Sequence, residues 1–300
     1  MTQTVLLAGA TGMLGSRIAH HLLQQPEAKL RLFIRDSAAK RTQLEPLLKR
    51  GAEIIEGDFT DRDALDRATH GVDVIVSAVQ GGPDVIIDGQ VALAEAGKRN
   101  GVRRILPSDY ALDIFNATPG EHLMFDLRRT ADAHIAALGL EQVNVLQGAF
   151  MDLLLPGRGA IDLDAGTVTY WGDGTQPIEV TTVEDTARMT ARVALDSSVA
   201  SGKFAFAGDL ISFQGAAEVI EAHTGRALER RSLGSEATLR AAKAEAEKDA
   251  TNPYGAVMLD YLLYMLNGQT ALSDLQNDRY PDVKLETFAD FAARNLPVHA

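Results

Sequence analysis

A glycine-rich turn near the N-terminus constrains the fold of this chain most strongly. An apolar run at residues 4–8 leads into glycines at every third position, Gly9, Gly12 and Gly15, and a helical pattern follows over residues 16–23. This order predicts a strand, a nucleotide-binding loop and a helix. Gly9 allows a sharp exit from the strand, Gly12 lets backbone N–H groups approach a pyrophosphate, and Gly15 lets the helix pack closely on the sheet.

The context of the turn supports this interpretation more than its spacing does. The spacing is G-x-x-G-x-x-G rather than G-x-G-x-x-G, but a second apolar strand at residues 29–34 arrives where a βαβ unit requires it. The alternative is a glycine-containing turn that binds no ligand. We do not expect a signal peptide, because no basic segment precedes the apolar run and glycines interrupt it.

The loop Gly9-Ala10-Thr11-Gly12-Met13-Leu14-Gly15 resembles that of the atypical short-chain dehydrogenases, in particular the NmrA-like and isoflavone-reductase-like branch. Residues 170–174, 182–187 and 280–284 resemble the same family. The resemblance implies a Rossmann fold with a smaller substrate domain, and usually NADP(H) as cofactor. It places the cofactor against Gly9, Thr11, Gly12, Met13, Leu14 and Gly15.

Short apolar runs alternate with helical patterns through the first half of the chain. This alternation predicts an α/β fold with a doubly wound parallel Rossmann sheet, because strands separated by helices need right-handed crossovers. We expect strands at 4–8, 30–34, 53–56, 72–77, 102–107 and 142–147, and helices at 13–24, 38–49, 62–68, 85–100 and 120–137.

The pattern changes after Gly148, where glycine and proline break the chain into shorter pieces. We expect a dinucleotide-binding domain at 1–152 and a smaller C-terminal α/β substrate domain at 153–300, with segments near 178–207 returning to the Rossmann sheet. Within this second part we expect strands at 167–171, 178–182 and 204–207, and helices at 183–195, 213–223, 236–247 and 253–266.

Composition excludes several kinds of protein. The chain has no cysteine, which rules out disulfides, thiolate zinc sites and cysteine nucleophiles, and its seven histidines show no metal-ligand spacing, so we expect no metal. A net charge of -12 argues against a nucleic-acid surface. The apolar segment 258–266 is too short to span a bilayer. We therefore expect a cytoplasmic protein with neither nucleic acid nor membrane as partner.

The end of the second strand predicts the coenzyme. An NAD site places an acid there, whereas an NADP site places a cation for the 2′-phosphate. The residue is Arg35, and Lys40 follows in the next helix, which favours NADP(H). Asp36 keeps NAD open, and a surface Arg35–Asp36 pair is the alternative.

Further cofactor contacts are expected at the ends of the third to fifth strands, because sites in open α/β sheets gather at the carboxyl ends of strands. The family resemblance places adenine near Asp58 and Phe59 and the nicotinamide ribose near the fourth strand. Turn chemistry at these positions, and a core role for Phe59, are the alternatives. The candidates are Asp58, Phe59, Ala78, Val79, Gln80 and Ser108.

The reacting groups depart from the family pattern. Residues 106–110 resemble the Pro-Ser-Glu-Phe motif of isoflavone-reductase-like enzymes, with Tyr110 in place of the Phe. The lysine of those enzymes corresponds to Arg128, and no lysine lies between Lys98 and Lys203. Arginine stays charged and is a poor base. We therefore expect Arg128 to polarise the acceptor and Tyr110 or His122 to donate a proton.

His122 and Asp126 stand four residues apart on one expected helix, so that Asp126 could orient the imidazole; a partly exposed helix pair is the alternative. A stripe made by Tyr254, Met258, Tyr261, Leu262 and Met265 predicts either an apolar pocket wall or core packing.

Together these features predict an NADPH-dependent reductase that passes hydride to a small, apolar or aromatic carbonyl, alkene or benzylic acceptor. The alternative is a non-catalytic NADP(H)-binding sensor like the NmrA regulators. The oligomeric state is left open.

Overall fold

The computed structural model describes residues 2–157, 160–249, 251–252 and 254–296. The chain forms two compact units, each built from several segments. Unit 1 comprises Met1–Tyr110, Leu127–Val145 and Val183–Phe204, and unit 2 comprises Ala111–Asp126, Leu146–Thr182 and Ala205–Ala300. No helix in the described part of the chain is long and apolar enough to cross a membrane.

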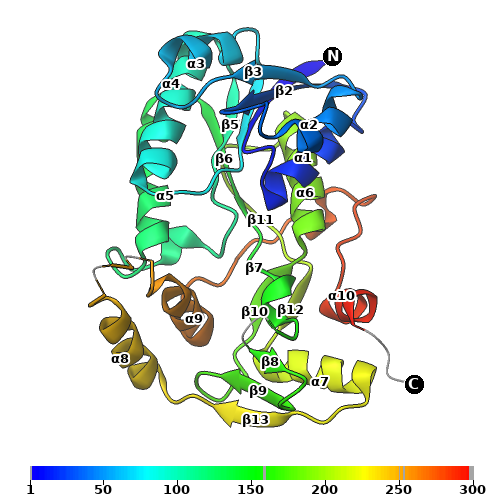
Figure 1. Cartoon of the computed structure of the whole chain (residues 1–300), viewed down its shortest axis with the longest axis vertical. Coiled ribbons are helices and arrows are strands. Elements are labelled where there is room, and N and C mark those ends of the chain that lie inside the picture. The colour runs from blue at the N-terminus through cyan, green and yellow to red at the C-terminus, as the bar shows by residue number, and fades with distance from the viewer. Residues whose placement is uncertain (1, 158–159, 250, 253, 297–300) are drawn as a thin grey trace. The chain divides into compact units, whose positions relative to one another are not determined.

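Unit 1 contains a seven-stranded sheet in the order β11-β6-β5-β4-β1-β2-β3 (Figure 1). All five pairings from β3 to β6 are parallel. The strand order reverses between β1 and β4, which confirms the predicted doubly wound Rossmann sheet. Its strands are β1 (Gln3–Ala8), β2 (Ala28–Ile34), β3 (Glu53–Glu56), β4 (Val74–Ser77), β5 (Arg104–Leu106), β6 (Glu141–Leu146) and β11 (Gly202–Ala205).

Helices cover both faces of this sheet, so the central strands are mostly apolar and largely buried. On one face α1 (Met13–Leu22) packs against α6 (Val183–Leu195), and on the other α3 (Arg62–Thr69) packs against α4 (Gln90–Arg99) beside α5 (Leu123–Ala137) (Figure 1). The short α2 spans Arg41–Leu48. The helix expected at 85–100 begins as a π-helical turn, Asp84–Gly89, before α4.

One buried arginine attaches the returning segment to unit 1. Arg104 of β5 is fully buried, and its guanidinium donates to the carbonyl oxygens of Val193 at 3.1 Å, Asp196 at 2.6 Å and Val199 at 2.7 Å. These carbonyls lie at and beyond the C-terminal end of α6, where helix acceptors have no partner of their own. Arg104 therefore ties α6 and the strand that follows it to the Rossmann sheet.

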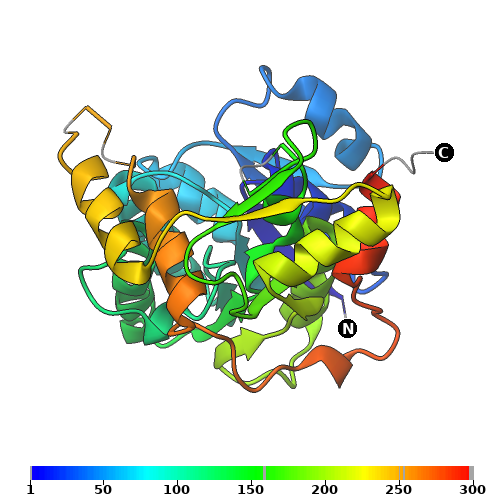
Figure 2. The same cartoon turned by 90° about the horizontal axis from the view of Figure 1, so that it is seen from below.

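Unit 2 contains two three-stranded sheets, β12-β10-β7 and β13-β9-β8. Among its helices α8 and α9 lie side by side in both views (Figures 1 and 2). Its elements are β7 (Ala149–Phe150), β8 (Ile161–Asp162), β9 (Thr167–Tyr170), β10 (Ile178–Thr181), β12 (Asp209–Ile211), β13 (Glu229–Ser232), α7 (Phe213–Thr224), α8 (Glu236–Ala246), α9 (Val257–Asn267) and α10 (Phe288–Asn295).

The two units are divided at other residues than the boundary expected after residue 152, and Val183–Phe204 of unit 1 lies within the segment expected to return near 178–207. Residues 111–126 and 146–152 belong to unit 2, because Ala149 of β7 pairs with Val180 of β10 and not with the large sheet. The helix expected from Pro253 begins at Val257, and Pro253 itself lies outside the described residues.

Candidate functional site

The glycine loop after β1 is held in place by backbone contacts. Gly9 has a positive φ of 88°, and a Cβ atom there would lie 2.2 Å from the carbonyl oxygen of Ala78. A Cβ on Gly15 would lie 2.1 Å from the carbonyl oxygen of Gly9. No side chain fits at either position. Gly9 and Gly15 thus have the turn and close-packing geometry that the sequence predicts.

Gly12 is less confined. A Cβ at Gly12 would meet only the carbonyl oxygen of Gly9, at 3.3 Å, so the space beyond it is open. Gly12 is the N-cap of α1, whose first turn has neither a side-chain cap nor an acidic residue. The first N–H groups of a helix without such partners, at the positive end of its dipole, suit a phosphate group. Thr11, Met13 and Leu14 flank this opening.

The other candidate positions follow the carboxyl ends of neighbouring strands of unit 1. The hydroxyl of Ser108, after β5, donates to the carbonyl oxygen of Val79, after β4, at 2.7 Å. The backbone N–H of Ser108 donates to Oε1 of the buried Gln90 at 2.9 Å. In the sequence Gln90 is only one polar residue in a helical pattern, so its role could not be predicted. It fixes the strand end that carries Ser108, while Ala78 and Gln80 flank Val79.

Arg35 and Lys40, the expected phosphate ligands, are both exposed after β2. Asp36 accepts the backbone N–H of Ala39 at 3.0 Å and so stabilises a local turn. Within the described ranges Arg35 forms no ion pair with Asp36. The positive charge of Arg35 instead acts on Asp58, where it is the smallest of several influences on the carboxyl pKa.

Asp58 and Phe59, after β3, have structural roles. Hydrogen bonds from Thr60, first from its hydroxyl at 2.6 Å and then from its backbone N–H at 2.8 Å, hold the pKa of Asp58 below its usual value. The ring of Phe59 packs on Phe33, with centroids 5.8 Å apart. A Cβ on Gly89 would lie 2.6 Å from the Phe59 ring, so this glycine is required for the contact. The role of Gly89 could not be predicted from the sequence, because it depends on the contact with Phe59 in the folded protein.

Tyr110 has an unusual backbone. Its φ is +32°, a left-handed conformation that costs a bulky residue conformational energy and that occurs often at functional sites. The phenol oxygen is buried beside Thr190 of α6. Burial raises the pKa of the phenol above its ordinary value, and the Thr190 hydroxyl offsets only part of this. Tyr110 is therefore a weaker acid than a free tyrosine.

Arg128 faces two carboxyls that the sequence analysis did not assign. Its positive charge acts on Asp109, which precedes Tyr110, and on Asp132, one turn further along α5. Asp109 accepts from the amide of Asn144 at 2.8 Å. Only the i,i+4 spacing of Arg128 and Asp132 could have suggested this arrangement.

His122 lies in unit 2, immediately before α5, and is fully buried. Its ring stacks on Phe125 with centroids 3.7 Å apart and meets Tyr261 edge-on at 4.4 Å. The alternative of a partly exposed helix pair is therefore wrong for the imidazole. Asp126 accepts the backbone N–H of Gly120 at 2.9 Å.

A buried lysine lies next to this aromatic cluster. Lys243 of α8 donates to the backbone carbonyl of Glu121 at 2.5 Å, and its Nζ lies 3.1 Å from Oδ1 of Asp260 in α9. The side chains of Lys243 and Asp260 are only 12% and 4% exposed. These residues are far apart in the sequence, so the contacts of Lys243 with Glu121 and Asp260 could not be predicted from it.

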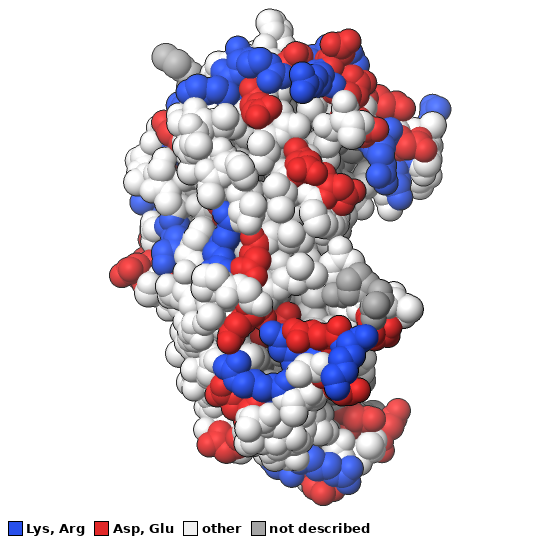
Figure 3. Space-filling model, turned by 90° about the vertical axis from the view of Figure 1, so that its left-hand side faces the viewer, with Lys and Arg blue, Asp and Glu red and all other residues white. Residues whose placement is uncertain are grey.

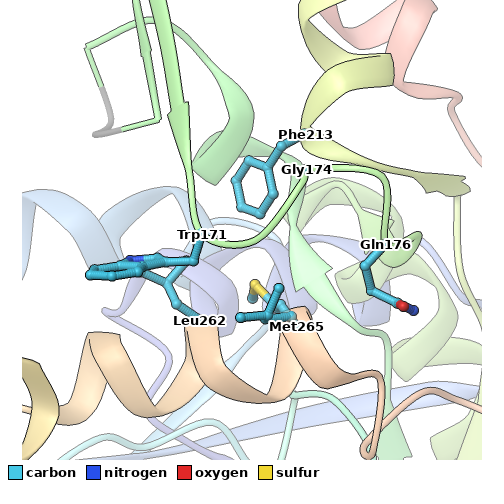
Figure 4. Close-up of a pocket in the computed structure, with 7 residues that line it drawn as sticks. Trp171, Gly174, Gln176, Phe213, Leu262 and Met265 are labelled. Atoms are coloured by element: carbon cyan, nitrogen blue, oxygen red, sulfur yellow. The ribbon is translucent and has the colours of Figure 1, made fainter. Parts of the chain in front are cut away.

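Unit 2 also contains a small apolar pocket (Figure 4). The loop after β9 carries the only tryptophan of the chain, Trp171, over the face of α9 that presents Leu262 and Met265. The space open to the centre of a water molecule is about 10 Å³, on the order of a single water. Of the predicted stripe, Leu262 and Met265 line this pocket, Tyr261 packs on His122, and Tyr254 and Met258 are exposed.

Charged side chains of both signs are interspersed on the face shown in Figure 3. Arg99 and Asp66 of unit 1 form an exposed ion pair, 2.8 Å apart. Among the residues that the structure describes, no group of three His, Asp or Glu could hold a metal ion.

The sheet with its switch point, the glycine loop and the strand-end residues define a Rossmann-type dinucleotide-binding class of protein. The model of the NmrA-like family matches residues 1–252. The chain therefore belongs to the NmrA-like family, as the glycine loop predicted.

Known relatives and solved structures agree with this assignment. Pinoresinol reductase 1 of Arabidopsis thaliana is 30% identical over 64% of each chain, and isoflavone reductase homolog A622 of Nicotiana glauca is 26% identical over 96% of each. A structure of AtPrR2 with NADP+ and (+)pinoresinol has a TM-score of 0.85 at 22% identity, covering 99% of each chain. The leucoanthocyanidin reductase–NADPH complex of Vitis vinifera has a TM-score of 0.80 at 22% identity, covering 97% of this chain and 98% of that one. At these identities the structural likeness establishes the fold.

Proposed function

We propose that this NmrA-like protein is an NADPH-dependent reductase of small, apolar or aromatic molecules. The open first turn of α1 behind Gly12 carries the proposal, because no side chain of the described residues caps its N–H groups where a pyrophosphate would lie. The exposed Arg35 and Lys40 would hold the 2′-phosphate. The names of the relatives support reductase chemistry, and the pinoresinol in one related structure supports an aromatic substrate.

The cofactor would supply the hydride, while the protein binds and orients the acceptor. The acceptor class we propose is a carbonyl, an activated alkene or a benzylic ether. Arg128 would polarise the acceptor oxygen through its fixed positive charge. Tyr110 is one candidate proton donor, and the buried His122 is the other.

A non-catalytic sensor is the second candidate. One reason is that Arg128 occupies the position of the lysine in isoflavone-reductase-like enzymes. Another is that the carboxyls of Asp109 and Asp132 face Arg128. Such a protein would bind NADP(H) and signal through a protein partner.

The deciding experiment measures NADPH consumption by the unaltered protein with aryl ketones, conjugated alkenes and lignan-like benzylic ethers. A reductase oxidises NADPH in the presence of at least one class of acceptor. Tight NADPH binding with no consumption across the whole panel would reject the reductase and favour the sensor.

A further inference from the structure

Gln90, the first residue of α4, holds the end of β5 through its side-chain amide. The backbone N–H of Ser108 donates to Oε1 of Gln90 at 2.9 Å, and Nε2 of Gln90 donates to the carbonyl oxygen of Ile86 at 2.9 Å. One partner is a donor and the other is an acceptor, so only one orientation of the amide satisfies both. The Gln90 side chain is 1% exposed, and its amide is fixed in that orientation.

The backbone that carries Gln90 is also held in place. Gln90 directly follows the π-helical turn Asp84–Gly89, which contains the Ile86 carbonyl that accepts from its amide. Gly89 lies against Phe59, since a Cβ there would be 2.6 Å from the Phe59 ring. Turns of this kind occur frequently at functional sites. Backbone and side chain together therefore set the position at which Gln90 meets Ser108.

Both hydrogen-bond donors of Ser108 are used within the protein. Its N–H donates to Gln90, and its hydroxyl donates to the carbonyl oxygen of the partly exposed Val79, after β4, at 2.7 Å. A hydroxyl has one proton and two lone pairs, and a carbonyl oxygen has two lone pairs. Ser108 Oγ can therefore only accept a further hydrogen bond, and the Val79 oxygen keeps one lone pair. A ligand that reaches these two oxygens must bring a donor.

The order of the strands indicates which half of a dinucleotide would meet these oxygens. The sheet contains the order β5-β4-β1-β2-β3, with Gly12 following β1 and Arg35 following β2. In the proposed function the pyrophosphate lies at Gly12 and the 2′-phosphate at Arg35, so the adenosine half lies on the side of β2. A dinucleotide bound across the switch point places its other half on the opposite side of β1. The strands on that side are β4 and β5, which lead into Val79 and Ser108.

We propose that Gln90 is a positioning residue for the nicotinamide half of NADP(H). It holds Ser108 so that Ser108 Oγ and the Val79 carbonyl oxygen accept hydrogen bonds from the donors of that half, the ribose hydroxyls and the carboxamide N–H. Gln90 acts through Ser108 and does not itself touch the cofactor. This inference rests on the proposed function, because it requires NADP(H) as the ligand.

The first test compares the binding of NADPH with that of adenosine 2′,5′-bisphosphate, which carries the 2′-phosphate but no nicotinamide. Gln90→Met keeps the length of the side chain and removes both amide contacts. We expect the variant to bind NADPH about tenfold more weakly in calorimetry, and to bind the bisphosphate as the wild type does. Equal losses for both ligands, or an unchanged NADPH affinity, would overturn the proposal alone. An absence of NADPH binding in the wild type would reject the proposed function as well.

The matched control is Leu93→Val, a change at a fully buried apolar position one turn further along α4. It removes a methylene group from the core, so it loosens the packing of α4 without removing a hydrogen bond. This variant should keep the wild-type ratio of the two affinities. If the ratio changed as much as in Gln90→Met, loosening of α4 would explain both effects and the proposal would fail.

The second test needs no cofactor and follows amide hydrogen exchange by NMR. The Ser108 N–H donates to Gln90, so Gln90→Met should speed its exchange by at least about tenfold. The amides of Val76 and Leu106, which are partners in the pairing of β4 with β5, should keep their rates. An unchanged exchange rate at Ser108 would overturn the proposal whether or not the protein is a reductase.

If Gln90→Met does not fold, Ser108→Ala replaces it. This variant keeps the N–H that Gln90 holds and removes the oxygen that would accept from the cofactor. We expect weaker NADP+ binding with unchanged bisphosphate binding, and wild-type NADP+ affinity would overturn the proposal. The 3-acetylpyridine analogue of NADP+, which lacks the carboxamide N–H, identifies the donor. The loss persists with the analogue if a ribose hydroxyl donates and disappears if the carboxamide donates, and either result agrees with the proposal.

Discussion

A Cβ atom on Gly15 would lie 2.1 Å from the carbonyl oxygen of Gly9, whereas one on Gly12 would lie 3.3 Å from that same oxygen. The two glycines should therefore respond differently to substitution. We expect Gly12→Val to keep the fold and lose NADPH binding, because its side chain would fill the space for the pyrophosphate. Gly15→Val should unfold or strongly destabilise the protein. Calorimetry and thermal unfolding measure the two effects, and unchanged NADPH affinity in a folded Gly12→Val protein would contradict the site.

Arg35 should determine coenzyme choice. A charge-assisted contact with the 2′-phosphate contributes about 1.5–3 kcal/mol, so Arg35→Ala should weaken NADPH binding by roughly 10- to 150-fold. NADH lacks this phosphate and should bind almost unchanged. Lys49→Ala, which removes another exposed cation, serves as the control. Equal losses for both coenzymes would assign Arg35 a structural role.

The proton donor can be tested at Tyr110. Tyr110→Phe removes only a buried hydroxyl, so the fold and the NADPH affinity should persist. If the phenol donates the proton, turnover should fall roughly a hundredfold or more. Arg128→Ala should likewise lower turnover with little effect on NADPH affinity. If Tyr110→Phe and Arg128→Ala both keep the full rate, another group donates the proton. His122→Gln is then the next variant to test.

The buried pair of Lys243 and Asp260 should matter more for stability than an exposed pair does. Asp260→Asn removes the buried partner of Lys243 and leaves only the more exposed Glu247, whose carboxylate lies 3.5 Å from Nζ, so it should lower the free energy of unfolding by more than about 1 kcal/mol. The exposed pair of Lys248 and Glu245 provides the control, and Glu245→Gln should change it by less than about 1 kcal/mol. Denaturant unfolding measures both, and similar small losses would contradict a stabilising role for the pair of Lys243 and Asp260.

Arg104 should be difficult to replace. Arg104→Met leaves the buried carbonyl oxygens of Val193 and Val199 without this donor, and each such loss costs about 1–3 kcal/mol. Arg103, the preceding residue, is partly exposed and pairs with Glu141. Arg103→Met should therefore cost no more than about 1 kcal/mol. If Arg104→Met lowered the free energy of unfolding by as little as Arg103→Met, packing alone would hold α6 against the sheet.

The Rossmann sheet, the NmrA-like family and the glycine loop could all be predicted from the order of the residues. Each of these depends on residues that lie close together in the chain: an apolar strand, glycines at fixed spacing and an amphipathic helix. Local spacing sets backbone geometry directly, so the turn at Gly9 follows from the sequence. The strand β13 (Glu229–Ser232) is charged and has no apolar pattern, so it was not predicted as a strand.

Contacts between polar groups that are distant in the chain could not be predicted, because they form only in the folded protein. Arg104 with the carbonyls after α6, Lys243 with Asp260, and Asp132 with the neighbourhood of Asp109 are separated by long stretches of chain or by different elements. The unit boundaries have the same origin, since β7 pairs with a strand that comes about 30 residues later. The energetic cost of burying a charge depends on what surrounds it after folding, and this surrounding is not encoded in any local pattern.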